Sequence, residues 1–202
     1  MKKILLVIIG ITLASAAFCQ EEGDEYRTIF GNKNISVSGF GAFDMQFSYM
    51  GGGYAFGAGG SGGVLLGGQV FFGGFGMGCN IDKTVEMNNL TIDHVGIGYG
   101  GLMFGYIINH KKAIHPAVYL QTGWGGVNSY DNHNSMYDNY PYDNVFVLNP
   151  SVEMEMNITR FFRMAVGANY QITTGVNEYT TLNNSDFSGP GGKISFRFGW
   201  FN

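Results

Sequence analysis

The last ten residues of the chain alternate strictly between apolar and polar side chains. Successive side chains of a strand point to opposite sides, so the residues of one face would be Ile194, Phe196, Phe198 and Trp200. The residues of the other face would be Lys193, Ser195, Arg197 and Gly199. Such a strand fits a soluble sandwich, and it fits a transmembrane barrel whose apolar row meets lipid. The aromatic apolar row, and the end of the chain directly after it, favour the barrel.

The first residues have the organisation of a bacterial secretory signal peptide. A basic start at Lys2 and Lys3 is followed by an apolar run and then by small residues. The apolar run is too short to span a membrane. Cleavage after Ala16 or after Cys19 fits this pattern, and we assign residues 1–19 to the signal peptide. The chain is therefore expected to be exported.

Composition narrows the class of the exported chain to a closed barrel. It has 33 glycines and 15% aromatic residues, and only 13% of its residues are charged, against about a quarter in soluble domains. No apolar run of about 18 residues follows the signal peptide, so a transmembrane helix is not expected. A barrel satisfies all backbone groups between its strands. The net charge of −4 argues against nucleic acid as a partner.

We predict an all-β fold, an eight-stranded antiparallel up-and-down transmembrane β-barrel over residues 34–202. A periplasmic leader at 20–33 would precede it. The predicted strands are 34–49, 54–66, 69–79, 90–108, 113–127, 146–158, 162–173 and 193–200. The barrel would be closed by pairing of Ser36–Tyr49 with Lys193–Trp200.

The connections alternate between short and long, as in bacterial outer-membrane barrels. The short ones are Gly67-Gly68, Asn109–Lys112 and Thr159-Arg160. The long ones are residues 80–89, 129–143 and 177–188, with Gly51–Gly53 as a short exception on the same side. Short turns and both chain ends would then share the periplasmic end.

Two features fit this pattern less easily. The segment 54–78 is nearly half glycine, which we interpret as a hairpin and not as a phosphate-binding loop, because no helix and no lysine follow it. Pro150 lies inside a predicted strand, where its missing N–H group removes a ladder hydrogen bond. A β-bulge at Pro150 would reconcile it with the barrel.

Five glycine-rich or polar motifs carry a resemblance to a known group of proteins. They are Gly59-Gly60-Ser61-Gly62-Gly63, Gly73-Gly74-Phe75-Gly76, Gly98-Tyr99-Gly100-Gly101, Asn157-Ile158-Thr159-Arg160-Phe161-Phe162-Arg163 and Asn184-Ser185-Asp186-Phe187-Ser188-Gly189. The chain resembles small glycine-rich outer-membrane β-barrel proteins of Gram-negative bacteria. The resemblance implies the barrel fold and an outer-membrane location. The group has no assigned activity, so it supplies no catalytic residues.

The polar rows of the predicted strands would point into a narrow lumen. Their candidate site residues are Asp44, Gln46, His115, Glu153, Glu155, Arg163, Lys193 and Arg197. An eight-stranded barrel is just wide enough for side chains to fill it, and buried acids and bases should pair. We therefore predict a polar plug in place of a hydrophobic core, with Arg163 paired to Glu153. The alternative of an acid–base pair formed by His115 with Glu153 or Glu155 lacks a nucleophile.

The predicted loop 129–143 is rich in oxygen donors and tyrosines. The donors are Asp131, Asn132, Asn134, Asp138, Asn139 and Asp143. The EF-hand pattern fails, because His133 replaces a donor and the glycine and closing glutamate are missing, so no metal is expected. Four tyrosines are candidates for contact with a surface glycan or a protein partner: Tyr130, Tyr137, Tyr140 and Tyr142.

Three hypotheses for the function follow. The leading one is a non-enzymatic outer-membrane barrel with a structural or surface-interaction role, in contact with membrane lipid, monomeric and without a cofactor. The second is a membrane-embedded enzyme that modifies lipid or lipopolysaccharide, which would need a grouped serine, histidine and acid. The third is a soluble periplasmic barrel that binds an apolar ligand, which predicts apolar side chains inside the barrel.

Overall fold

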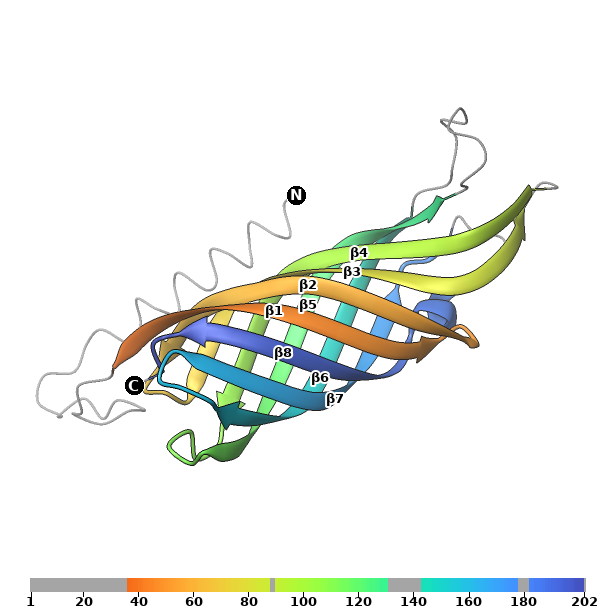
Figure 1. The fold of residues 1–202 in the computed structure, drawn as a ribbon. Coiled ribbons are helices and arrows are strands. Elements are labelled where there is room, and N and C mark those ends of the chain that lie inside the picture. The colour runs from red at the N-terminus through yellow and green to blue at the C-terminus, as the bar shows by residue number, and fades with distance from the viewer. Residues whose placement is uncertain (1–35, 88–89, 131–142, 178–181, 202) are drawn as a thin grey trace, which may run out of the picture. The chain divides into compact units, whose positions relative to one another are not determined.

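The computed structural model describes residues 36–87, 90–130, 143–177 and 182–201, and these form one closed antiparallel barrel (Figure 1). The strands are β1 (Val37–Met50), β2 (Gly53–Leu66), β3 (Val70–Met87), β4 (Leu90–Ile107), β5 (Ile114–Tyr130), β6 (Asp143–Asn157), β7 (Phe162–Thr174) and β8 (Gly189–Gly199). A short 3-10 helix, η1 (Asn184–Phe187), lies between β7 and β8. The predicted fold class is confirmed. The predicted signal peptide at 1–19 and leader at 20–33 lie outside the described residues.

The barrel is closed by the first and last strands. β1 pairs with β8 from Phe40 opposite Gly199 to Ser48 opposite Gly191, within the two segments predicted to close it. Each strand therefore has a neighbour on both sides, and the sheet has no free edge. In the part of the chain that the structure describes, no helix is long and apolar enough to cross a membrane.

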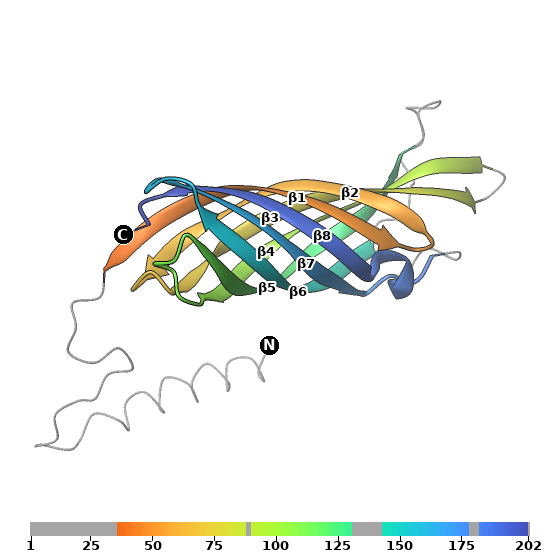
Figure 2. The same cartoon turned by 60° about the horizontal axis from the view of Figure 1, so that its bottom comes forward.

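The hairpin turns are those that the glycines predict. Gly67 and Gly68 have φ angles of 59° and 71°, and Gly51 and Gly52 have φ angles of 61° and 82°. Positive φ at both central residues suits a tight two-residue hairpin turn and favours glycine. Figures 1 and 2 show that β1 begins, and β8 ends, at the barrel end that carries the turn at Gly67.

The predicted loop at 80–89 is wrong. β3 continues to Met87 and β4 begins at Leu90, with one register shift between Asp82 and Val85. The two strands form a hairpin that extends past the β1–β2 turn (Figure 2). The polar composition predicts a loop, but backbone pairing in a hairpin does not require an apolar face. Its polar residues therefore do not argue against pairing.

The predicted loop at 129–143 is shorter at both ends, whereas the connection predicted at 177–188 runs from the end of β7 at Thr174 to the start of β8 at Gly189. β5 continues to Tyr130 and β6 already begins at Asp143, so residues 129–130 and 143 of the predicted loop are in strands. The remaining residues, 131–142, lie outside the described part of the chain. The predicted loop at 177–188 contains η1.

Pro150 is accommodated without a bulge. β6 pairs with β7 up to Leu148 opposite Ile172, and pairing resumes at Ser151 opposite Asn169. The register is the same before and after this gap. The ladder is interrupted here, because proline has no N–H group to donate. Pairing with β5 continues through Leu120 opposite Pro150. The predicted bulge is therefore wrong, and the strand tolerates a local gap in one ladder.

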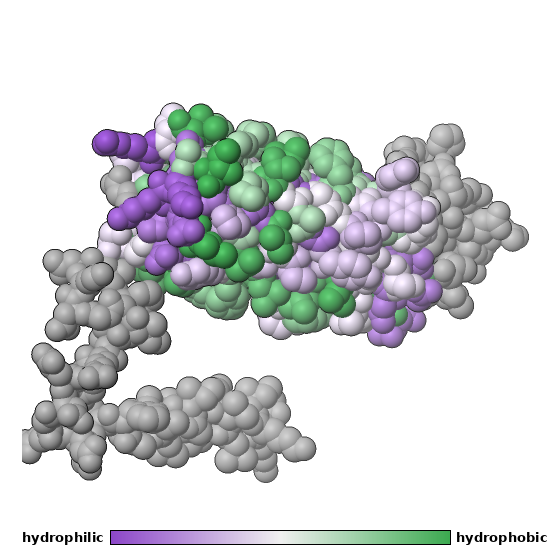
Figure 3. Space-filling model, turned by 90° about the horizontal axis from the view of Figure 1, so that it is seen from below, coloured by the Kyte–Doolittle hydropathy of each residue, from purple (hydrophilic) through white to green (hydrophobic). Residues whose placement is uncertain are grey.

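The outer wall of the barrel is apolar and aromatic. Aromatic residues directly opposite one another on neighbouring strands lie in contact, with ring centroids 5.0 Å apart for Phe47–Phe56 and 5.1 Å apart for Phe72–Phe104. Such cross-strand pairs stabilise a sheet. Figure 3 shows hydrophobic residues along the wall and hydrophilic residues gathered at the barrel end where β1 begins. The apolar rows of β1 and of β5 to β8 face outward, whereas β3 and β4 also carry apolar residues on their inward face.

The glycines fall into an inward and an outward set. A Cβ atom on any of the inward glycines would lie under 3.0 Å from a neighbouring strand or lumen side chain: Gly57, Gly59, Gly63, Gly73, Gly101, Gly105, Gly123, Gly125, Gly167, Gly189, Gly191 and Gly199. A Cβ on the outward Gly41, Gly76 or Gly98 would meet nothing within 4 Å. The inward set thus permits the strands to curve tightly around a small lumen.

We expect Gly73→Ala to destabilise the barrel, because its Cβ would overlap the backbone of Gly62 and Gly63. The loss in the free energy of unfolding should be about 1–3 kcal/mol, as for other overpacked sites. Gly76→Ala on the same strand is the matched control and should change stability by less than about 0.5 kcal/mol. Urea unfolding in detergent micelles measures both. Equal effects of the two substitutions would contradict the inward–outward division.

Candidate functional site

The structure places all eight predicted site residues inside the barrel, and each is buried: Asp44, Gln46, His115, Glu153, Glu155, Arg163, Lys193 and Arg197. They come from β1, β5, β6, β7 and β8. The alternation of side chains along these strands brings them together, since the opposite rows face outward. Seven of the eight form one connected cluster, which we call the ionic cluster. Gln46 belongs to a separate group.

Arg197 is the central cation of the ionic cluster. Its Nη2 atom donates to Glu153 and its Nη1 atom donates to Glu155. Lys193 Nζ lies 3.5 Å from Asp44 Oδ1 and 3.6 Å from Glu153 Oε1. The two Arg197 contacts are charge-assisted hydrogen bonds, the strongest kind available to a side chain, whereas Lys193 forms ion pairs without a hydrogen bond.

The predicted pairing of Arg163 with Glu153 is wrong. Arg163 Nη1 instead donates to Glu155 Oε2, at 3.4 Å. The register explains the difference, because Arg163 stands opposite Asn157, two residues from Glu155 and four residues from Glu153. The inward residues that follow on β7 are Ala165 and Gly167. They are small, which leaves room for the β8 cations to reach over β7 to β6.

Glu155 is the residue on which most contacts converge. His115 Nε2 lies 3.0 Å from Glu155 Oε2, and the Tyr119 hydroxyl donates to Glu155 Oε1. The second ring nitrogen of His115 lies 2.9 Å from the carbonyl oxygen of Lys112. The Arg197 guanidinium lies 4.4 Å from the centre of the Tyr119 ring, which is within cation–π range. Tyr119 is a further partner of Glu155 that was not among the predicted site residues.

Two serines complete the environment of Asp44. Ser61 Oγ donates to Asp44 Oδ2 at 2.6 Å, and Ser195 Oγ donates to Asp44 Oδ1. Neither serine was among the predicted site residues. Ser195 lies on the polar row of the last strand, so the alternation there was an available signal, whereas nothing in the glycine-rich run around Ser61 pointed to Asp44.

Gln46 belongs to an amide cluster beside the ionic one. It accepts a hydrogen bond from Asn149 at 3.1 Å, and its own amide nitrogen donates to Gln171 at 3.2 Å and to Ser48 at 2.9 Å. Gln171 also accepts from the Tyr99 hydroxyl at 2.9 Å. The neutral amides thereby satisfy one another without drawing on the charged groups.

The ionic cluster is balanced in charge. Three carboxylates, Asp44, Glu153 and Glu155, face three permanent cations. The cations are Arg163, Lys193 and Arg197. A buried charge without a partner is strongly destabilising, so this balance is a condition for burying any of the six. Glu153 Oε1 and Lys193 Nζ make no hydrogen bond, but they lie 3.6 Å apart and therefore form an ion pair.

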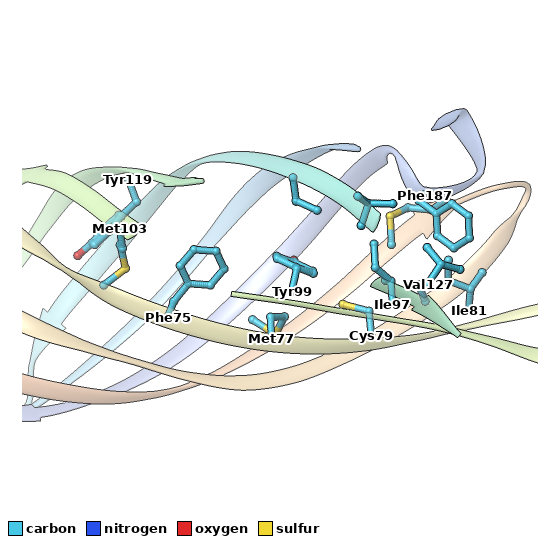
Figure 4. Packing of buried hydrophobic residues seen from close by; sticks show 14 of the residues in the cluster. Phe75, Met77, Cys79, Ile81, Ile97, Tyr99, Met103, Tyr119, Val127 and Phe187 are labelled. Carbon is cyan, nitrogen blue, oxygen red and sulfur yellow. The ribbon is translucent and has the colours of Figure 1, made fainter. Parts of the chain in front are cut away.

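The remaining part of the lumen is apolar. Its buried side chains come mainly from β3, β4 and β5, and Figure 4 shows part of this cluster inside the barrel. They include Phe71, Phe75, Met77, Cys79, Ile81, Val95, Ile97, Tyr99, Met103 and Val127. The polar rows therefore fill only one side of the lumen, and the expectation that they replace the hydrophobic core throughout was too broad. The glycine-rich strands hid this apolar row.

Aromatic side chains lie at both ends of the described lumen. At one end Phe187 of η1 is buried, and its carbonyl oxygen accepts from Thr173 Oγ1 at 2.7 Å and from Gln171 Nε2 at 3.1 Å. At the other end the Phe201 ring lies 4.1 Å from the Arg163 guanidinium. A cavity of about 10 Å³ remains beside Tyr119, Arg163 and Phe201, which is room for about one water molecule.

The described residues hold no group of three or more His, Cys, Asp or Glu side chains that could bind a metal ion. Of the oxygen donors predicted in the 129–143 loop, only Asp143 is described. It is buried, and its Oδ2 atom accepts a hydrogen bond from the backbone of Asn177 at 3.1 Å. The other donors lie outside the described residues.

No protein-family model matches the chain, and no curated protein matches its sequence. Among solved structures, the N-terminal β-barrel domain of Pseudomonas aeruginosa OprF aligns with a TM-score of 0.50 and 13% identity, over 81% of this chain and 96% of that one. Neisserial surface protein A aligns with a TM-score of 0.54 and 10% identity, over 84% and 100% of the two chains.

This chain has the fold of the small outer-membrane β-barrels. The shared features are the closed antiparallel sheet and the coverage of nearly the whole of each similar barrel. At 10–13% identity the likeness concerns the fold alone. The contacts of the ionic cluster are therefore described from this chain's own residues.

We expect Arg197→Ala to destabilise the barrel strongly, because it removes the guanidinium that donates to both Glu153 and Glu155, two buried carboxylates. The loss in the free energy of unfolding should be about 3–5 kcal/mol. Combining it with Glu153→Ala should cost less than the sum of the two single changes, since each removes the other's partner. Unfolding by urea in detergent micelles, followed by tryptophan fluorescence, measures the cycle.

The control is Arg160→Ala, in the exposed β6–β7 turn. No ion pair joins Arg160 to a carboxylate of the described residues. Its removal should change the free energy of unfolding by less than about 0.5 kcal/mol. Strict additivity of Arg197→Ala and Glu153→Ala would show that the two groups do not interact.

Proposed function

We propose that the chain is a non-enzymatic β-barrel of a Gram-negative outer membrane, with a structural or surface-interaction role and a lumen plugged by its own side chains. The observation that carries the proposal is the inverted distribution of polarity. Three carboxylates and three cations are buried inside the barrel, while large apolar side chains are exposed around it. Water does not favour this arrangement, whereas a bilayer does.

The extent of the exposed apolar surface supports a membrane location. Trp124, Val152 and Trp200 are 68%, 61% and 64% exposed, and similar residues occur on all eight strands. Monomeric soluble proteins rarely expose apolar patches beyond a few hundred Å². A wall that is apolar on every strand therefore requires lipid as its surroundings. Membrane lipid is thus the first partner that we propose, and the closed sheet needs no second copy.

The contents of the lumen support the plug. Among the described residues, the cavity beside Arg163 and Tyr119, next to the ionic cluster, has a volume of about 10 Å³. A path for solutes through the described part of the barrel would require several of these side chains to move together. The cost of separating buried ion pairs makes the closed state the stable one.

The geometry argues against the two alternative functions. Both ring nitrogens of His115 are engaged, with Glu155 and with the Lys112 carbonyl, so neither is free to activate a nucleophile. An apolar ligand would need space in the apolar cluster, but Phe187 and its neighbours fill it. A water-soluble carrier of an apolar ligand would also need an apolar interior and a polar exterior, whereas this barrel has buried charges and an apolar exterior.

A surface partner remains part of the proposal through the segment 129–143. Its two flanking positions, Tyr130 and Asp143, lie at the barrel end opposite the turn at Gly67 (Figure 1). With the chain ends on the periplasmic side, the end of β5 and the start of β6 lie at the extracellular end of the barrel. The tyrosines of the segment suit contact with a glycan or a protein, because they offer large, rigid, amphipathic surfaces.

We expect Val152→Arg to destabilise the barrel in a bilayer. Val152 lies outward near the middle of β6, and a cation on the lipid face costs about 2–4 kcal/mol at the bilayer midplane. Urea unfolding from phosphatidylcholine vesicles measures the loss, with Val152→Ile as the matched apolar control. A change below about 0.5 kcal/mol, as at an ordinary exposed site, would contradict the lipid-facing assignment.

Fractionation of cells that express the full chain tests the location directly. The protein should remain with the membranes after washing with salt or carbonate and should be released by detergent. Its mobility on gels should differ between boiled and unboiled samples, because a closed barrel resists unfolding by the gel detergent. Release into the periplasmic fraction without detergent would instead support the soluble alternative.

A further inference from the structure

Two turns at the end of the barrel that holds the chain ends are fastened to each other. The β4–β5 turn spans residues 108–113 and the β6–β7 turn spans 158–161. The Asn157 amide nitrogen donates to the carbonyl oxygens of His110 at 3.1 Å and Lys112 at 2.9 Å, and its backbone N–H donates to Ala113 at 2.8 Å. Neighbouring turns are thereby held side by side in a fixed arrangement.

These two turns carry three exposed cations, Lys111, Lys112 and Arg160, which we call the basic rim. No ion pair joins any of them to a carboxylate of the described residues. The nearest described carboxylates of β6, Glu153 and Glu155, are committed to the ionic cluster inside the barrel. Within the described ranges of the chain, the basic rim is therefore a local excess of positive charge that no carboxylate pairs with. Figure 3 shows hydrophilic residues gathered at this end of the barrel.

The electrostatics of a neighbouring histidine agree with this excess. His110 lies in the β4–β5 turn, outside the strands, and is half-buried. Burial, followed by the positive charges of Arg163, Lys111 and His115, lowers the pKa of His110 below its ordinary value. A further cation is thus disfavoured here, as expected where cations gather without compensation.

The basic rim lies next to the apolar wall, at the barrel end that holds the chain ends. Ile108 and Ile114 flank the first turn, and Phe161 lies next to Arg160 in the second; all three are exposed on the outside. Trp200 contacts Phe161, with ring centroids 5.7 Å apart. Aromatic side chains followed immediately by lysine and arginine are typical of the level at which a bilayer changes from acyl chains to headgroups.

We propose that the basic rim binds the phosphate groups of anionic phospholipids in the periplasmic leaflet. This inference rests on the proposed function, since it requires the barrel to span a bilayer with its chain ends in the periplasm. Phospholipid is favoured over other polyanions because the cations lie one to three residues from lipid-facing side chains, at headgroup depth. Each cation near an anionic membrane surface should contribute a preference on the order of fivefold.

The two tryptophans of the chain provide reporters for the test. Trp200 lies at the level of the basic rim, whereas Trp124 lies ten residues along β5 from Ile114. The mature chain with Trp124→Phe is refolded into phosphatidylcholine vesicles that contain a small fraction of brominated phosphatidylglycerol or of brominated phosphatidylcholine. Bromine quenches tryptophan fluorescence on contact, so the quenching reports which lipid lies beside Trp200. Trp200→Phe, which retains Trp124, is the matched control.

We expect brominated phosphatidylglycerol to quench Trp200 with an apparent affinity at least tenfold above that of brominated phosphatidylcholine. Trp124 should show no such preference. Replacing Lys111, Lys112 and Arg160 together by glutamine should abolish the preference of Trp200, and high salt should reduce it. If the triple variant folds poorly, Arg160→Gln and Lys111→Gln singly should each lower the preference several-fold.

Equal quenching of Trp200 by the two lipids would overturn the inference, as would an equal preference at both tryptophans or a preference that survives in the triple variant. Failure of the proposed function gives a different result. If the barrel does not enter the bilayer, neither lipid quenches either tryptophan.

Discussion

The seam between β1 and β8 is the constraint on which the rest of the structure depends. Inside a bilayer every backbone N–H and C=O group must find its partner within the protein. The pairing from Phe40–Gly199 to Ser48–Gly191 completes that requirement for the first and last strands. Once the sheet is closed, each inward row is removed from solvent and each outward row is exposed to the surroundings, so the inward side chains must satisfy or pack against one another.

The two sides of the lumen meet this demand in different ways. Around the seam, β6, β7, β8 and β1 contribute charges and amides that satisfy one another, with Glu155 and Arg197 at the centre. On the far side, β3 and β4 contribute a conventional apolar row, including Phe75, Met77 and Ile97. Small residues on the inner face, such as Gly73 and Gly167, let these side chains and strands approach closely.

Much of this fold could be predicted from alternation alone. The rows on the last three strands are unambiguous, because large apolar residues such as Met154 and Phe196 alternate with charged ones. Prediction from alternation was wrong where polar residues belong to a strand and where glycines interrupt an apolar row. Residues 80–87 are polar yet belong to β3, and glycine between apolar residues hid the inward row of β3. Which charges meet depends on the register between strands, and alternation does not give the register. The predicted pair of Arg163 with Glu153 was therefore wrong, because the register brings Arg163 to Glu155.

The order in which the charges occur along the chain has a consequence for assembly. The carboxylates of Asp44, Glu153 and Glu155 all precede β8, whereas Lys193 and Arg197 arrive only with the last strand. A nascent chain that ended before β8 would hold three acids against the single guanidinium of Arg163. The addition of β8 therefore both closes the sheet and balances the buried charges. A barrel without β8 is unsuited to hydrocarbon for two reasons, because it has unpaired backbone groups and because it has unpaired carboxylates.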